Sequence, residues 1–293
     1  MRRALGLLSM SLVLAAPMLG RTAAEASVHH PPSWQETTVG SDQELRGLAP
    51  VDSHTAWVSG DDGGVWRTTD RGATWEDVSP PDAAGLLFRD VEATDARHAW
   101  LLAIGPGDGS RIYRTTDGGA TWATTFVNDD PNAFYDCMAM WPGGRTGLAV
   151  SDPPDGKFRI LRTHDFGRTW SVVPDAGTPP AGTAELGFAA SGTCLVTAGH
   201  RRTTVRGRRR TPGTAVGPGS RAAISAVTVP AWPGLRARRT ARGRHQRQRR
   251  DLRRRAHLDG VRDRPGGFDS IQCLPGGTCW ASGADGRVGV LRR

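Results

Sequence analysis

The sequence predicts an all-β fold that is built from repeated sheet units. One pattern, Thr/Ser-x-Asp-x-Gly-x-Thr-Trp, occurs three times, and successive Asp residues are 47 and 48 positions apart. Each copy follows a short apolar or β-branched run and precedes another, which is the order strand, turn, strand. A period of this length is typical of stacked or radial arrays of small sheet units. The copies span residues 67–75, 114–122 and 162–170.

The Asp, Gly and Trp of each copy are expected to be structural. The Asp can accept hydrogen bonds from backbone N–H groups inside the turn. The Gly can take the positive φ that a tight turn needs, and the Trp can bury its ring against the neighbouring unit. Identical Asp residues at the same place in every repeat cannot all serve one active site. The residues are Asp70, Gly72, Trp75, Asp117, Gly119, Trp122, Asp165, Gly167 and Trp170.

A wider unit repeats around this pattern. Residues 56–60, 99–103, 147–151 and 279–283 resemble one another as a second strand, so each unit contains about four short strands, as a propeller blade does. Unit starts near residues 46, 88, 134, 186, 232 and 268 predict six blades, with seven as the alternative. Residues 33–39 resemble the strand after the pattern, and residues 286–291 resemble the strand before it. The N-terminal strand is therefore expected to complete the last blade and leave no free sheet edge.

The repeated pattern resembles the Asp-box, or bacterial neuraminidase repeat. Over residues 46–199 and from residue 268 on, the chain resembles secreted bacterial Asp-box β-propellers, most specifically in residues 45–48, 104–117 and 151–158. These propellers are related to the photosystem II stability and assembly factor and, more distantly, to sortilin-type propellers and sialidases. Relatives are often labelled as oxidoreductase or glycosyl hydrolase. The chain has no Gly-x-Gly-x-x-Gly after a strand, no flavin or haem motif and no clustered metal ligands, so we expect no cofactor and no metal.

The N-terminus has the pattern of a secretory signal peptide, residues 1–26. Arg2 and Arg3 precede an apolar run, and cleavage is expected after Ala26. We therefore expect a secreted or extracytoplasmic monomer without a membrane span, in which residues 27–200 and 266–293 form blades.

The four cysteines permit disulfides in an exported protein. Cys273 and Cys279 flank residues 274–278 on two arms of one hairpin and are the candidate pair, with the unpaired state left open. Cys137 and Cys194 lie in different predicted blades and are expected to be unpaired.

An Arg-rich segment, about residues 201–265, interrupts the repeat. Residues 201–262 contain 19 Arg, no Lys and two acids, and the rest of the chain has 19 basic and 27 acidic residues. One reading is an arm that binds nucleic acid or another polyanion, but the segment lacks the interleaved aromatics of a single-strand binder. We interpret it instead as the product of two compensating frameshifts near residues 200 and 265. Read in another frame with common codons, residues 252–258 can encode a complete Asp-box. We expect poor order in this segment and no nucleic-acid partner.

The starts of the innermost strands are the candidate binding site of such a propeller. They carry both charge signs and one aromatic residue, which suits polar recognition of a protein or glycan better than burial of an apolar ligand. We therefore favour a non-catalytic binding or assembly scaffold. The residues are Arg46, Arg89, Asp90, Tyr135, Asp136 and Asp269.

The alternative is a sialidase-like glycoside hydrolase. Sialidase chemistry uses three convergent Arg residues, a Tyr nucleophile paired with Glu and an Asp acid. Tyr135 is the candidate nucleophile, because Tyr113 lies beside the second Asp-box on the outer part of its unit. Convergence of Tyr135 with three Arg side chains would favour the hydrolase.

Overall fold

The computed structural model describes residues 33–174 and 268–292 continuously, and short stretches between them. Those stretches are residues 176, 178, 180–181, 185–186, 194–198, 202–209 and 224–229. Over these residues the chain is almost entirely β, with one short 3-10 helix, η1 (Gly107–Gly109), and no α-helix. The predicted signal peptide, the predicted blade near residue 232 and most of the Arg-rich segment lie outside the described residues.

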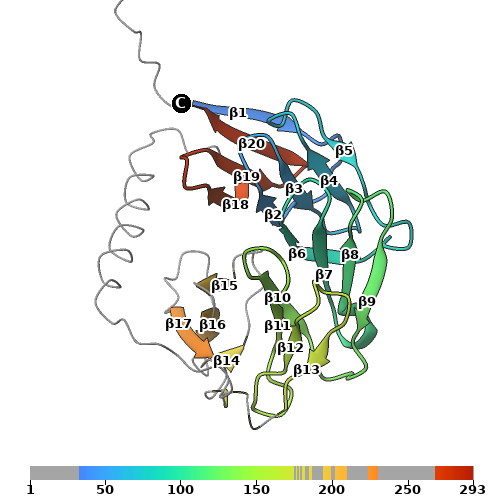
Figure 1. The fold of residues 1–293 in the computed structure, drawn as a ribbon, viewed down its shortest axis with the longest axis vertical. Helices are drawn as coiled ribbons and strands as arrows, with labels where there is room; N and C mark the ends of the chain where they lie inside the picture. The colour runs from blue at the N-terminus through green and yellow to red at the C-terminus, as the bar shows by residue number, and fades with distance from the viewer. Residues whose placement is uncertain are drawn as a thin grey trace, which may run out of the picture. The chain divides into compact units, whose positions relative to one another are not determined.

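Five four-stranded antiparallel sheets form the described fold (Figure 1). The first contains β2 (Gly47–Pro50), β3 (Ala56–Ser59), β4 (Val65–Thr68) and β5 (Glu76–Asp77). The second contains β6 (Leu87–Ala93), β7 (Ala99–Ile104), β8 (Arg111–Thr115) and β9 (Ala123–Val127). The third contains β10 (Tyr135–Met140), β11 (Gly147–Ser151), β12 (Ile160–Thr163) and β13 (Ser171–Val172). In each of these three sheets the strands lie side by side in chain order, as in propeller blades.

The fourth sheet has a different strand order. It contains β14 (Glu185–Leu186), β15 (Leu195–Ala198), β16 (Arg202–Arg209) and β17 (Ile224–Val229). Strand β16 pairs with each of the other three, so the strands do not follow one another in chain order. Strands β16 and β17 fall in the Arg-rich segment, where the frameshift interpretation stays a hypothesis. The number of six blades likewise stays a prediction.

The fifth sheet joins the two ends of the described chain. It contains β18 (Phe268–Cys273), β19 (Cys279–Gly283), β20 (Arg287–Arg292) and β1 (Ser33–Thr38). Strand β1 pairs antiparallel with β20 along its whole length, from Ser33 opposite Arg292 to Thr38 opposite Arg287, as Figure 1 shows. The prediction that the N-terminal strand completes the last sheet is therefore confirmed.

The repeated pattern forms three turns of the same geometry, here called the Asp turns (residues 68–75, 115–122 and 163–170). In the second, the Asp117 carboxylate accepts hydrogen bonds from the Thr121 backbone N–H (3.0 Å) and hydroxyl (2.6 Å). Gly119 has φ +89°, a left-handed conformation that glycine adopts without steric cost. The first and third turns repeat these contacts around Asp70 and Asp165.

The threonine that begins the repeated pattern, to which the sequence analysis gave no role, completes each Asp turn. The hydroxyl of Thr115 donates to Asp117 and accepts the buried N–H of Gly119 at 3.0 Å. Thr68 and Thr163 do the same in the other two turns. Each of these threonines is 1% exposed, so water cannot replace the hydroxyl as acceptor. The buried donor of each turn therefore depends on threonine, whereas the exposed donors depend on aspartate.

The tryptophans of the Asp turns pack between sheets. Trp122 lies edge-to-face on Trp57 of the preceding sheet, with ring centroids 6.3 Å apart, and its indole N–H donates to the carbonyl of Val78. Trp75 packs in the same way on Trp280, at 6.1 Å. Trp57, Trp100 and Trp280 are 0–1% exposed. These aromatic contacts form much of the packing between neighbouring sheets.

Two disulfides tie the described strands. Cys273 and Cys279 are bonded across the turn between β18 and β19. Cys137 of β10 is bonded to Cys194, next to β15, with Cα atoms 5.8 Å apart. The prediction that Cys137 and Cys194 are unpaired is therefore wrong. It treated different blades as distant, but β10 contacts β15 of the next sheet.

Candidate binding site at the starts of the first strands

The first strands of neighbouring sheets contact one another, and each carries a polar residue at its start. Strand β2 contacts both β18 and β6, and β6 contacts β10. The pairing register slips at Arg89 in β6, at Asp136 in β10 and at Asp269 in β18. Arg46 stands at the same place, directly before β2. A β-bulge re-aims the side chain of the extra residue, so the fold presents Arg46, Arg89, Asp136 and Asp269 as equivalent first-strand entries.

Three of these entries lie in one electrostatic cluster. Glu44 forms an ion pair with Arg46 at 2.5 Å. A second side-chain hydrogen bond joins Glu44 to Asp269. Burial lowers the pKa of Arg89, and the positive charge of Arg46 lowers it further. The negative charges of Glu44, Asp61 and Asp269 oppose this lowering of the Arg89 pKa. We call this set the mixed-charge cluster: Glu44, Arg46, Asp61, Arg89 and Asp269.

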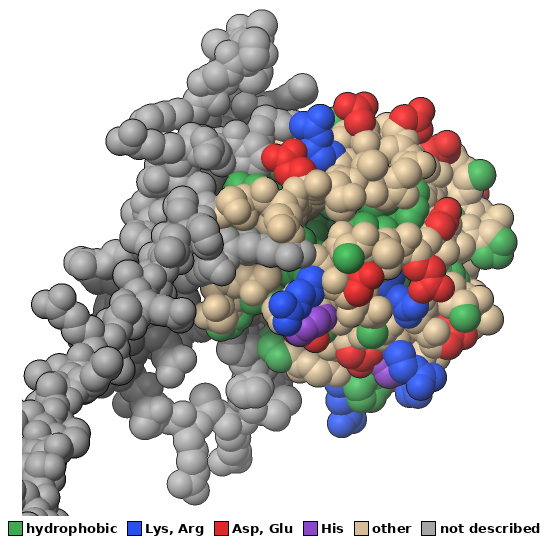
Figure 2. Space-filling model, turned by 90° about the horizontal axis from the view of Figure 1, so that it is seen from above, with side chains coloured by type: hydrophobic (Ala, Val, Ile, Leu, Met, Phe, Trp, Pro, Cys, Tyr) green, Lys and Arg blue, Asp and Glu red, His purple; other side chains and the backbone are tan. Residues whose placement is uncertain are grey.

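Within the described residues, the mixed-charge cluster contains a buried donor without a partner and an exposed carboxyl group. The Arg89 Nε atom is buried and has no hydrogen-bond partner among the described residues. Asp269 is exposed at the surface, but the buried part of its carboxyl group and the charge of Glu44 raise its pKa. Figure 2 shows acidic and basic side chains interspersed over the described face, without a large area of one sign. Such a surface suits a partner that carries charges of both signs.

Asp90 and Glu92 of β6 serve the contact between two sheets. The Asp90 carboxylate is fully buried and accepts the backbone N–H of Met138 at 2.8 Å. Glu92 accepts the N–H of Met140 at 3.3 Å. Burial and the nearby charge of Glu92 raise the pKa of Asp90, and burial raises the pKa of Glu92 to about 7. Asp90 therefore satisfies donors of β10 and is not on a surface that a partner could touch.

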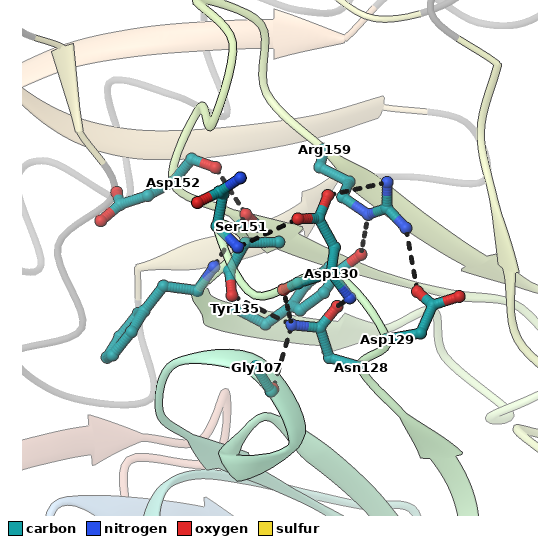
Figure 3. Close-up of polar contacts among 11 residues, drawn as sticks. Gly107, Asn128, Asp129, Asp130, Tyr135, Ser151, Asp152 and Arg159 are labelled. Atoms are coloured by element: carbon teal, nitrogen blue, oxygen red, sulfur yellow. Dashed lines mark hydrogen bonds and ion pairs between the residues drawn. The ribbon is translucent and has the colours of Figure 1, made fainter.

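Tyr135 lies in a second polar group, which Figure 3 shows in detail. Its hydroxyl accepts a hydrogen bond from Arg159 Nε at 3.2 Å. The Arg159 guanidinium also pairs with Asp129 and Asp130, each at 3.3 Å. Burial raises the pKa of Tyr135 to about 12, which opposes formation of a phenolate nucleophile.

Asn128 holds the loop that carries Asp129 and Asp130. The Asn128 side chain is 2% exposed, and its amide N–H groups donate to the carbonyls of Gly107 (3.0 Å), Asp130 (2.8 Å) and Ala133 (3.0 Å). The bond to Gly107, drawn in Figure 3, links two loops, and the other two bonds lie within residues 128–133. Asp129 and Asp130 are therefore fixed in front of Arg159 by a buried amide.

Asp136, the entry of β10, is almost fully buried. It is 5% exposed, and burial, together with the Asp152 carboxylate, raises its pKa to about 8. The Asp136 Oδ2 atom has no hydrogen-bond partner among the described residues. The disulfide of Cys137 follows directly along the strand. Burial and the Asp152 carboxylate thus favour the protonated form of Asp136 in the interior of this entry.

The predicted residues therefore separate into different environments. Arg46, Arg89 and Asp269 come together in the mixed-charge cluster, whereas Tyr135 and Asp136 are buried near Arg159 and Asp152, and Asp90 faces β10. Sequence reasoning missed Glu44, Asp61 and Arg159. Glu44 could have been found from its place two residues before Arg46. Arg159 could have been found from the repeat, because it stands as far before Asp165 as Arg111 stands before Asp117. Asp61 lies in the turn between β3 and β4.

The described contacts of the Tyr135 hydroxyl involve one guanidinium, that of Arg159. Within the described ranges, no three His, Cys, Asp or Glu side chains are grouped so that they could hold a metal ion. In that same part of the chain, no helix has the length and apolar character needed to cross a membrane.

Comparisons with known proteins add weak structural similarities. The chain matches no protein-family model and no curated protein. It is similar to the structure of YCF48 from Cyanidioschyzon merolae, with 13% identity, a TM-score of 0.47 and coverage of 88% of this chain and 98% of that one. It is also similar to YCF48 bound to D1 peptide, with 15% identity and a TM-score of 0.44, over 85% of this chain and 65% of that one.

A third similar structure is an enzyme. The GH74 enzyme of Niastella koreensis shares 18% identity and a TM-score of 0.39, over 55% of this chain and 21% of the enzyme. The chain therefore spans less than two thirds of YCF48 in its peptide complex and about a fifth of the GH74 enzyme. Since all three TM-scores are below 0.5, these similarities assign no function to the residues described above.

Proposed function

We propose that this chain is an exported, non-catalytic β-propeller of the Asp-box type that binds a partner protein as a binding or assembly scaffold. Sheets with strands in chain order, repeated Asp turns and the β1–β20 pairing support the propeller. Two disulfides support export, because disulfides persist in oxidising compartments.

The observation that carries the binding proposal is the mixed-charge cluster. Arg46, Arg89 and Asp269 come from three different sheets but reach one another electrostatically. A cluster that costs desolvation and leaves the Arg89 Nε atom without a partner adds little to stability by itself. A polypeptide, which offers carbonyls, carboxylates and ammonium groups, can satisfy donors and acceptors of both signs, and a neutral glycan offers no charge to pair with them.

The proposal is tested by capture of a partner with the purified full chain. An Arg89→Ala, Asp269→Asn double variant should lose the partner that the unaltered chain retains from extracytoplasmic extracts. Arg97→Ala is the matched control, because Arg97 is exposed and lies in a turn away from the cluster. Equal recovery of the same partner by both variants would place binding elsewhere. A parallel assay of sialoside hydrolysis tests the enzyme alternative, since turnover that disappears in Tyr135→Phe would replace the scaffold by a hydrolase.

A further inference from the structure

A cavity of about 550 Å³ opens between the segment after β1 and the strands β4 and β5. It is lined by residues 39–43, Trp66, Trp75 and Asp77. Its volume falls within the range of about 300–1,000 Å³ that is usual for ligand sites. None of these residues belongs to the mixed-charge cluster or to the polar group around Arg159.

The walls of this cavity are held in place by the fold. The Gln43 amide oxygen accepts the backbone N–H groups of Asp62 (3.2 Å) and Gly64 (3.1 Å). Its amide nitrogen donates to the Asp62 carbonyl at 3.3 Å. These bonds fix the segment after β1 against the turn between β3 and β4. On the other side, Trp75 is packed edge-to-face on Trp280. The cavity is therefore preformed.

The charges that line the cavity are of one sign. Asp42 and Asp77 are exposed carboxylates, and no Lys, Arg or His lines the cavity. Asp77 accepts a hydrogen bond from the hydroxyl of Ser79. The apolar part of the lining comes from Val39 and from two indole rings, that of Trp75 and the edge of the largely buried Trp66, which is 5% exposed. Carboxylates repel an anionic ligand, and both carboxylates and indole faces attract a cation.

We infer that this cavity binds a cationic side chain, Arg or Lys, of a partner polypeptide. A polypeptide source fits the position, because residues 39–43 run directly into Glu44 and Arg46 of the mixed-charge cluster. The same partner could thus place one side chain in the cavity and continue across the first-strand entries. The inference adds a second contact to the proposed function, but its chemistry rests on separate residues and can fail or hold by itself.

The experiment uses the purified full chain and two small probes. N-acetyl-arginine amide carries the cation, and N-acetyl-citrulline amide is its neutral isostere. Binding is followed in two-dimensional NMR spectra through the indole N–H signals of Trp66 and Trp75. We expect weak binding of the arginine probe that declines as salt is added, and no shift of these signals with the citrulline probe. Equal binding of both probes would overturn the inference.

Variants of the two carboxylates test the same inference from the protein side. The Asp42→Asn, Asp77→Asn double variant should bind the arginine probe about fivefold more weakly or worse, because both charges are lost. Asp155→Asn, an exposed loop position, is the matched control and should bind as the unaltered chain does. If the double variant melts early, Asp42→Asn alone serves, since the Asp42 side chain is exposed. Unchanged affinity in the folded carboxylate variant would contradict the inference.

The two proposals are separated by one further variant. Arg89→Ala should bind the arginine probe normally while it loses the partner protein. Loss of probe binding in Arg89→Ala would show that the probe binds at the mixed-charge cluster, and the cavity inference would then be wrong.

Discussion

The Asp turns and the first-strand entries each occur in several sheets. The Asp turns repeat a set of side-chain contacts, whereas the entries repeat a backbone position. In the three Asp turns the side chain and its contacts are the same, and the Thr N–H to Asp Oδ1 distances are 2.9, 3.0 and 3.0 Å. At the entries the backbone bulge repeats, but the residue changes from Arg89 to Asp136 and Asp269. A repeated contact stabilises the sheet in which it lies. A repeated position with changing charge can build one surface from several sheets.

The carboxylates of the two regions also differ in their electrostatics. Hydrogen bonds from Thr121 hold the pKa of Asp117 at about 2. Burial and the charge of Asp152 raise the pKa of Asp136 to about 8. The Asp turns therefore stabilise a carboxylate, whereas the interior of the β10 entry stabilises a carboxylic acid. Opposite pH dependences follow from this difference.

The largest expected effect concerns Asp136 and the pH. The pKa of this acid is about 4 in the unfolded chain and about 8 in the folded protein. Its contribution to the free energy of unfolding is therefore complete below pH 4 and is lost as the pH rises to 8. A rise of this size corresponds to a loss on the order of a few kcal/mol. Asp136→Asn should remove that part of the pH dependence. Urea unfolding of both proteins at pH 5 and pH 8.5 measures it, and equal pH dependence in both would contradict the assignment.

The next largest effect is expected at a threonine of an Asp turn. Thr115→Ala leaves the buried N–H of Gly119 without an acceptor, which should lower the free energy of unfolding by about 1–3 kcal/mol. Thr124→Ala, an exposed position on the following strand, is the control and should change stability by less than about 0.5 kcal/mol. Chemical denaturation measures both. Similar losses in the two variants would show that the turn hydroxyl has no special role.

A smaller effect is expected for the aspartate of the same turn. The two Thr121 donors that Asp117 accepts are exposed, so water can replace the carboxylate there, and Asp117→Ala should cost about 1 kcal/mol at pH 7. Because the folded pKa is lowered to about 2, this contribution is present above pH 4 and is lost as the pH falls towards 2. The difference from the unaltered chain should therefore shrink in acid. A stability difference that grows in acid would contradict this prediction.

The local parts of the fold could be predicted from the sequence, because they depend on neighbouring residues. The Asp turns follow from the spacing of Asp117, Gly119 and Trp122, and the β1–β20 pairing follows from matching strand patterns at the two ends. The left-handed conformation of Phe166 (φ 66°) recurs directly after the Asp of the other two turns, at Arg71 (φ 69°) and Gly118 (φ 83°), and the glycine of the second copy was the sequence signal for it. Phe166 serves a neighbouring sheet, since its carbonyl accepts the indole N–H of Trp100.

The site was less predictable, because it depends on contacts between sheets. The entry residues could be found from the repeat. The repeat does not show that Asp90 binds the backbone of Met138, whereas Arg89 lies near the charge of Arg46. The bulge separates these two adjacent side chains. The disulfide of Cys137 was missed for a related reason, since its partner lies 57 residues away in the next sheet.

The most direct test of this account measures partner affinity and thermal unfolding on the same two variants. Arg89→Ala should lower affinity for the captured partner at least about tenfold, the loss expected for a central charged contact, and should leave the melting temperature nearly unchanged. Asp117→Ala should bind the partner normally and melt several degrees lower. The reverse pattern, with binding lost in Asp117→Ala and kept in Arg89→Ala, would contradict the separation of stabilising turns from binding entries.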